Sequence, residues 1–402
     1  MSLCLLALSC LGASGAIFDL DEKPGKNCTV AQFRLWTPDG SEPLKGLFIL
    51  LAGWNGDGRG MANHSKWQEC AQRVGFGIIG CHFKSANTQT RYDLPENGSG
   101  QILLQAIKTF GEQSKHPEME FLPLALYGFS AGGQFSCQFA CWKPLQVIAF
   151  VAVKGGVYIL NPGASVDRIP AIFFAGAKDT EVRQKNIKKI FEQERGANAL
   201  WCHVLEANTG HDAGRSADLA RPFFEAIIKM RVPSRSPGRS GPVNLQPANE
   251  SHGWACDLKT FEIMPAGSFR KPKRDSAWLP DETCAKIWQA LVKGDASLPE
   301  NGGSPATAST SSPQPPPAST APGAPSAPAI AAPPSYPQKA VCAKAVDAFD
   351  PANPSKQLGQ FMAGSELIIE GKDDASGMLR ATFKQPNGGE IRALCRPGDL
   401  GQ

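Results

Sequence analysis

A serine lies between two glycines at the end of an apolar run. The segment Leu124–Gly133 reads Leu-Ala-Leu-Tyr-Gly-Phe-Ser-Ala-Gly-Gly, so Ser130 occupies a Gly-x-Ser-x-Gly pattern between an expected strand and an expected helix. This pattern is typical of a nucleophilic serine on a sharp, strained turn, where glycines let the strand and the helix approach closely. The hydroxyl then lies over a helix N-terminus, which favours negative charge. We therefore expect Ser130 to be a nucleophile.

An acid and a base follow this serine. Asp179 comes after the apolar run 169–177, and His211 lies in a loop after the run 200–205. We expect His211 to take the proton from Ser130 and return it to the leaving group, while Asp179 holds the imidazole in the right tautomer. Of the six histidines, only His211 has both this chain order and a loop context. The alternatives are a helix N-cap for Asp179 and a surface histidine for His211.

The oxyanion that forms when such a serine attacks needs two backbone N–H donors. We expect one from Ala131, directly after the serine. The other should come from the loop after the apolar run 47–52, from Trp54 or Asn55. Three glycines give this loop freedom to turn its amides inward: Gly53, Gly56 and Gly58.

The elements that must position these residues alternate along the chain. Short apolar runs predict strands at Gln32–Trp36, Leu47–Ala52, Gly77–His82, Leu122–Tyr127, Val147–Val153, Ala171–Ala175 and Leu200–Leu205. Amphipathic stretches predict helices at Gly60–Val74, Gly98–Gln113, Ala131–Trp142, Val182–Glu194 and Ser216–Arg231. Strand–helix alternation of this kind predicts an α/β fold with a doubly wound, mostly parallel sheet.

With these motifs in place, residues from about 28 to 232 resemble the α/β-hydrolase superfamily. They look most like small secreted esterases of the polyhydroxybutyrate-depolymerase and feruloyl-esterase type and the dienelactone-hydrolase group. The elbow Gly128–Gly132 and the Gly210-His211 context match that pattern. One departure is Ala52-Gly53, where those esterases carry His-Gly, and it bears on the second oxyanion donor. The resemblance implies acyl transfer through a covalent acyl-serine, with no metal and no organic cofactor.

The rest of the chain has a different composition. We predict a catalytic domain over residues 17–232 and an extension over 233–302, which is rich in Trp and should pack on it. Residues 303–338 hold eleven prolines and no charged residue, and they predict a semi-extended linker. Residues 339–402 alternate polar and apolar positions and predict a small all-β domain resembling SH3-like barrels. Cys342 and Cys395 bracket this domain, and a disulfide between them would stabilise it.

The N-terminus and the cysteines indicate export. Residues 1–16 are apolar and end in small residues, as in a signal peptide, although no basic residue precedes Lys23. We therefore expect a secreted or periplasmic protein, in which some of the ten remaining cysteines form disulfides. Cys137 and Cys141 lack the second pair of a zinc site, and one buried helix face explains their spacing better. No internal apolar run reaches the roughly 18 residues of a membrane span.

Charge and site chemistry narrow the function class. The formal net charge of +4 over 402 residues does not favour a nucleic-acid partner. The leading hypothesis is a carboxylic-ester hydrolase with an ester substrate, such as polymer-linked acyl groups or polyesters. A serine peptidase with the same triad is the second. A non-catalytic binding protein on the same scaffold is the third. Whether the protein is an enzyme or a binding protein, the β domain is a candidate for binding polysaccharide or cell wall.

Overall fold

The chain contains two compact units, and most of the described residues belong to the larger one. A computed structural model describes residues 14–40, 42–160, 168–233, 241–296, 338–341, 346–350, 353–361, 366–372, 378–384 and 390–395. The larger unit ends at Gly303 and the smaller one contains the C-terminal strands, and each is considered by itself. Most of the predicted leader and nearly all of the predicted linker lie outside the described residues.

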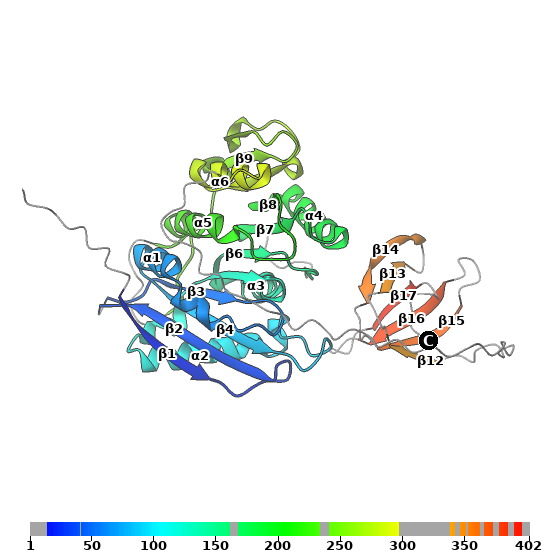
Figure 1. Cartoon of the computed structure of the whole chain (residues 1–402), viewed down its shortest axis with the longest axis horizontal. Helices are drawn as coiled ribbons and strands as arrows, with labels where there is room; N and C mark the ends of the chain where they lie inside the picture. The colour runs from blue at the N-terminus through cyan, green and yellow to red at the C-terminus, as the bar shows by residue number, and fades with distance from the viewer. Residues whose placement is uncertain are drawn as a thin grey trace, which may run out of the picture. The chain divides into compact units, whose positions relative to one another are not determined.

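The larger unit is built on an eight-stranded sheet with the order β1-β2-β4-β3-β5-β6-β7-β8 (Figure 1). Its strands are β1 (Gly15–Asp21), β2 (Val30–Pro38), β3 (Gly46–Leu51), β4 (Phe76–Lys84), β5 (Leu124–Phe129), β6 (Val147–Val153), β7 (Ala171–Gly176) and β8 (Trp201–Glu206). Strands β3 to β8 run parallel, whereas β2 is antiparallel to both β1 and β4. This arrangement confirms the predicted doubly wound, mostly parallel sheet.

Five helices connect or flank these strands, and a sixth lies in the extension. They are α1 (Ser65–Val74), α2 (Ser99–Gln113), α3 (Ala131–Trp142), α4 (Glu181–Gly196), α5 (Ser216–Arg231) and α6 (Glu282–Lys293). The single helix predicted over Gly60–Val74 is wrong in its first turn. A short 3₁₀ helix, Arg59–Asn63, precedes α1, because the backbone at His64 is extended and separates the two.

Hydrophobic cores cover both faces of the sheet. Helices α2, α3 and α4 bury residues such as Phe110, Phe135 and Phe191 against one face. Helices α1, α5 and α6 bury Trp67, Phe224 and their neighbours against the other. The central strands β3, β6 and β7 are buried along their whole length, which explains why each reads as a continuous apolar run.

Strand β1 is an element that we did not predict. It begins at Gly15, so the predicted leader boundary at residue 16 falls within a strand that pairs with β2. Its sequence alternates, with Phe18 and Leu20 half-buried and Asp19 and Asp21 exposed. That period of two is the signal of an edge strand with one solvated face.

The extension packs against the outer strand of the sheet. It forms a three-stranded sheet in the order β10-β9-β11, from β9 (Trp254–Asp257), β10 (Ile263–Pro265) and β11 (Ser276–Leu279), followed by α6. Trp278 and Trp288 are fully buried in the same core as α5, and the Trp288 indole donates to the backbone oxygen of His203 in β8 at 2.8 Å.

The smaller unit is an antiparallel sheet of six described strands in the order β12-β15-β16-β17-β13-β14. They are β12 (Gln338–Val341), β13 (Val346–Asp350), β14 (Asn353–Phe361), β15 (Glu366–Lys372), β16 (Leu379–Lys384) and β17 (Glu390–Cys395). Leu367, Ile369, Ala381 and Leu394 are buried and form its described core. This confirms a small all-β unit, whereas the SH3-like barrel stays a prediction. Cys342 lies outside the described residues, so its pairing with Cys395 also stays a prediction.

The cysteines that the structure describes in the larger unit are thiols. Within its described residues, none of these eight forms a disulfide: Cys28, Cys70, Cys81, Cys137, Cys141, Cys202, Cys256 and Cys284. All except Cys141 are buried, so they act as small apolar side chains in the core. Cys137 and Cys141 lie on α3, as their spacing predicts. Across the part of the chain that the structure describes, no helix is both long and apolar enough to cross a membrane.

Candidate active site

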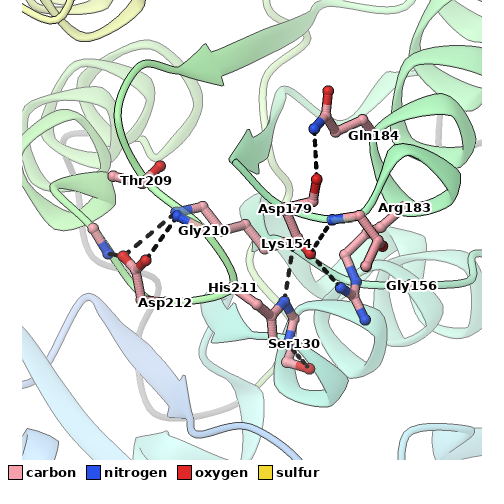
Figure 2. A network of polar contacts seen from close by, with 12 residues as sticks. Ser130, Lys154, Gly156, Asp179, Arg183, Gln184, Thr209, Gly210, His211 and Asp212 are labelled. Carbon is pink, nitrogen blue, oxygen red and sulfur yellow. Dashed lines mark hydrogen bonds and ion pairs between the residues drawn. The ribbon is translucent and has the colours of Figure 1, made fainter. Parts of the chain in front are cut away.

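Ser130 occupies a strained turn between β5 and α3 (Figure 2). Its φ of 52° and ψ of −116° lie in a region that a residue with a side chain rarely adopts. The neighbouring strand stabilises the turn, because the Ser130 N–H donates to the Val153 backbone oxygen at the end of β6 at 2.7 Å. The hydroxyl is thereby fixed at the carboxyl edge of the parallel strands, where binding sites of open α/β sheets lie.

The two glycines of the elbow are required by close packing. A Cβ on Gly128 would lie 2.1 Å from the carbonyl of Gly132, and a Cβ on Gly132 would lie 2.5 Å from the Ala52 oxygen. No other residue fits at either position without moving backbone. The spacing of the Gly-x-Ser-x-Gly pattern thus follows from how closely α3 approaches the ends of β3 and β5.

His211 lies in the loop between β8 and α5, which we call the histidine loop (residues 207–215). Its Nε2 is 3.0 Å from Ser130 Oγ and its Nδ1 is 3.0 Å from Asp179 Oδ2. The ring packs on Phe129, with 5.0 Å between the ring centroids, and about a third of the side chain (35%) is exposed. The structure therefore brings together the three predicted side chains in the geometry that proton transfer from Ser130 requires.

Asp179 follows β7, and its side chain is buried to 3% exposure. Burial opposes its ionisation, but the Thr180 N–H, His211 and Arg183 outweigh burial and lower the pKa of Asp179. Thr180 N donates to Oδ1 at 2.7 Å and Arg183 Nη1 at 2.6 Å, which leaves Oδ2 to His211. The residue at the N-cap of α4 is Thr180, so Asp179 does not fill the alternative role considered above.

The predicted oxyanion donors lie on both sides of Ser130. Ala131 is the first residue of α3, and its N–H is one of the amides that have no partner within the helix. Residues 53–56, which we call the oxyanion loop, lie opposite. A Cβ on Gly53 would be 3.6 Å from the Ser130 Cβ, so this loop runs directly beside Ser130. Trp54 follows, with 40% of its surface exposed.

Asn55 has partners away from the serine. Its side chain donates to the Ser85 oxygen at 3.2 Å and accepts from the Ser85 N–H at 2.8 Å. Its backbone N–H interacts with the Tyr92 hydroxyl. Because both its backbone and its side chain are used in this way, Trp54 is the better candidate for the second oxyanion donor.

Tyr92 anchors the oxyanion loop, and the sequence analysis did not identify it. Its hydroxyl donates to the Gly53 oxygen at 3.0 Å, and burial raises the pKa of this phenol, so it stays protonated. The Tyr92 ring stacks on Trp54 at 5.5 Å and on Phe83 at 5.7 Å. The stack continues into the core through Phe135 and Phe139. The loop that lacks the His-Gly of similar esterases is therefore held by an aromatic column.

Arg183 is a second residue of the site that sequence patterns did not single out. It lies one helical turn after Asp179 at the start of α4, and i,i+4 spacing of opposite charges is its only sequence signal. Among the described residues, no group of three or more His, Cys, Asp or Glu side chains is arranged to hold a metal ion.

Comparison with known proteins gives structural matches only. No protein-family model and no curated protein matches the chain. An S-formylglutathione hydrolase from Staphylococcus aureus aligns at 14% identity over 54% of this chain and 98% of its own, with a TM-score of 0.39. A ferulic acid esterase aligns at 12% identity over 54% and 99%, with a TM-score of 0.42. Poly(aspartic acid) hydrolase-1 from Sphingomonas sp. KT-1 aligns at 17% identity over 53% and 98%, with a TM-score of 0.41.

The fold assignment rests on the chain's own topology. The mostly parallel sheet with helices on both faces and the strand–Ser130–helix turn are those predicted from the sequence of residues 28–232. The chain accordingly has the α/β-hydrolase fold, followed by a separate small antiparallel β unit.

Proposed function

We propose that this protein is a serine hydrolase of carboxylic esters, with Ser130 as nucleophile, His211 as general base and acid, and Asp179 as the residue that orients His211. The observation that carries the proposal is the continuous line of contacts from Ser130 Oγ to His211 Nε2 and from His211 Nδ1 to Asp179, each 3.0 Å long. A strained serine in this setting has no evident structural purpose, whereas exposing a nucleophile explains it.

The proposed reaction has two halves. In the first, His211 Nε2 takes the proton of Ser130 Oγ while Oγ bonds to the acyl carbon, and the carbonyl oxygen becomes an oxyanion held by the N–H groups of Ala131 and Trp54. The carbon–alkoxide bond then breaks as His211 protonates the departing alcohol. In the second half, water loses a proton to His211 and attacks the acyl carbon. The bond between that carbon and Ser130 Oγ then breaks as His211 returns the proton to Oγ, which releases the acid and restores the Ser130 hydroxyl.

The exposed ring of Trp54 bears on the acyl group. One face of the ring stacks on Tyr92, the residue is 40% exposed, and it directly follows Gly53, which lies beside Ser130. An exposed indole favours planar aromatic groups by stacking. We therefore propose aryl or arylalkenyl esters, including polymer-linked ones, as the preferred substrates of a secreted or periplasmic enzyme whose C-terminal unit contacts the polymer.

The test is hydrolysis of p-nitrophenyl esters from acetate to longer chains, with a feruloyl ester and an aminoacyl anilide beside them. Wild type and Ser130→Ala are compared at equal concentrations of folded protein. The proposal predicts ester turnover that the substitution abolishes. Turnover of the anilide in preference to esters would favour a peptidase. An inactive but folded wild type would favour a binding protein on this scaffold.

A further inference from the structure

A buried lysine, Lys154, directly follows β6 and pairs with carboxylates on both sides of the segment that leads to His211. Lys154 has 0% exposure and a positive φ of 53°, and its N–H donates to the Phe174 oxygen of β7 at 2.9 Å. An ammonium group is costly to bury unless it is paired. Since its side chain has no exposed surface, Lys154 does not touch substrate, and its role must be exerted through its neighbours.

Two carboxylates of the β8–α5 connection pair with this ammonium. Lys154 Nζ lies 3.0 Å from Glu206 Oε2, which is 2% exposed, and 3.6 Å from Asp212 Oδ1, whose side chain is 57% exposed. The Nζ group lies among the described residues without a well-formed hydrogen bond, so the attraction is chiefly ionic. The lysine therefore contacts the last residue of β8, which leads into the histidine loop, and the residue next to His211.

The same two carboxylates fix the backbone of the histidine loop. Glu206 accepts from Arg215 N at 2.6 Å and from Thr209 Oγ1 at 3.3 Å. Asp212 accepts from Gly210 N at 3.0 Å (Figure 2). It also accepts from Gly214 N at 2.8 Å. These bonds bracket His211 on both sides, so the position of its ring depends on where the two carboxylates are held.

The turn that begins at Lys154 also contacts the elements that carry the other two catalytic residues. The side-chain oxygen of Gln134 in α3 accepts from Gly156 N at 2.7 Å. The backbone N–H of Gln134 donates to the backbone oxygen of Ser130 at 3.1 Å. Asn186 of α4, the helix that follows Asp179, donates to the Gly156 oxygen at 3.2 Å. Residues 154–156 thus connect the three elements of the triad.

We propose that Lys154 is a positioning residue, which sets His211 against Ser130 and Asp179 by holding Glu206 and Asp212. The proposal rests on the proposed function for its kinetic consequence, although the geometry of the His211 ring tests it separately. The alternative is that Lys154 only stabilises the fold. In that case, replacing Lys154 and Glu206 together would change neither the position of the His211 ring nor kcat.

The experiment compares Lys154→Met, the double variant Lys154→Met with Glu206→Gln, and Lys185→Met. The double variant removes both buried charges, so it keeps the test valid if Lys154→Met alone does not fold. Lys185 is the matched control, because it also pairs with a glutamate, Glu181, but on the exposed surface of α4.

The first readout is the hydrolysis of p-nitrophenyl acetate. We expect kcat of the folded variants at residue 154 to fall about tenfold to a hundredfold, because a displacement of the His211 ring near 1 Å costs about this much, while KM stays within about twofold. Lys185→Met should match wild type.

The second readout is the His211 ring itself. In protein with ¹⁵N-labelled histidine, the Nδ1–H that bonds to Asp179 should give a slowly exchanging signal, assigned by its absence in His211→Ala. We expect this signal to vanish in both Lys154 variants and to persist in Lys185→Met. If it persists in a folded Lys154 variant with wild-type kcat, the proposal is overturned. If wild type hydrolyses no ester but the signal still depends on Lys154, the proposed function fails and the positioning role stands.

Discussion

The two loops that flank Ser130 are stabilised in opposite ways. The oxyanion loop is held by neutral groups, with Tyr92 bonded to Gly53 and Trp54 stacked on the Tyr92 ring. The histidine loop is held by charges, through the buried pair of Lys154 and Glu206. In the proposed reaction, the first loop mainly has to present amides in a fixed place, whereas the second carries a side chain whose charge changes.

This contrast has an energetic consequence. Stacked rings gain from burial and dispersion in proportion to contact area, so a partial loss costs a partial amount. A buried ion pair behaves differently, because losing one member leaves the other charged and desolvated. A single substitution should therefore lower the free energy of unfolding far more in the histidine loop than in the oxyanion loop. Replacing both members of the ion pair together should lower it less than replacing one.

The largest effect should come from the acid that orients the base. Asp179→Asn should lower kcat on p-nitrophenyl acetate by about 10⁴-fold, because the amide favours the wrong tautomer of His211. Stopped-flow or steady-state assays measure it. Asp218→Asn is the control, since Asp218 also pairs with arginines but lies on α5. A loss under tenfold for Asp179→Asn would remove Asp179 from the triad.

The next largest effect should be a loss of folding stability when the buried Lys154–Glu206 pair is broken. Lys154→Met should reduce the free energy of unfolding by about 3–5 kcal/mol, because Glu206 is left buried and unpaired. Adding Glu206→Gln should restore at least half of that loss. Urea unfolding measures both, and Lys185→Met should stay within about 0.5 kcal/mol of wild type. Equal stabilities of the single and double variants would contradict the charge-supported loop.

Low pH should also destabilise the fold through His203 in β8, the strand that leads into the histidine loop. Burial, with a small contribution from Lys188, lowers the pKa of His203 to about 4, and among the described residues its Nε2 has no hydrogen-bond partner. Between about pH 6.5 and 4 the unfolded chain binds a proton that the folded chain does not, so stability falls as the pH falls.

The expected loss over this window is at most about 3 kcal/mol, and it should end near pH 4, where both states are protonated. Urea unfolding at a series of pH values measures it. His203→Phe should flatten the curve, and replacing His252 by Gln should not, because His252 is exposed. An unchanged slope in His203→Phe would assign the acid sensitivity to other groups.

The smallest effect should be on the oxyanion side. Tyr92→Phe keeps the aromatic column and removes only the hydroxyl that donates to the Gly53 oxygen. We expect about a tenfold lower kcat with little change in KM, and a loss of about 1 kcal/mol of stability. Tyr127→Phe is the matched control, since it removes a buried hydroxyl bond to Ser216 away from this loop. A kcat equal to that control would show that the hydroxyl does not position the loop.

The part of the fold that positions the serine was predictable from the sequence. Strand β6 and helices α3 and α5 have the bounds that were predicted, because apolar runs and helical periodicity are local signals. Strand β1 was missed because its first two residues were assigned to the predicted leader and the remaining five form only a short alternation. Its pairing with β2 is a contact that the sequence does not display.

The candidate site divides in the same way. Ser130, Asp179 and His211, which the structure brings together, could be predicted as a group because each follows a strand in a fixed chain order. Lys154 and Tyr92 were not found, because their contacts join residues far apart in the chain and leave no pattern of spacing. The one available signal was a lysine between a buried strand and Gly155-Gly156, where a charged residue is unexpected.

The most direct test of the account is the mass of the intact protein after reaction with a fluorophosphonate, followed by mapping of the modified peptide. Wild type should gain one phosphonyl group, on Ser130. Ser130→Ala should gain none, and His211→Ala should react far more slowly, because its serine loses its base. Modification at another residue, or equal labelling of wild type and His211→Ala, would contradict a nucleophilic serine activated by His211.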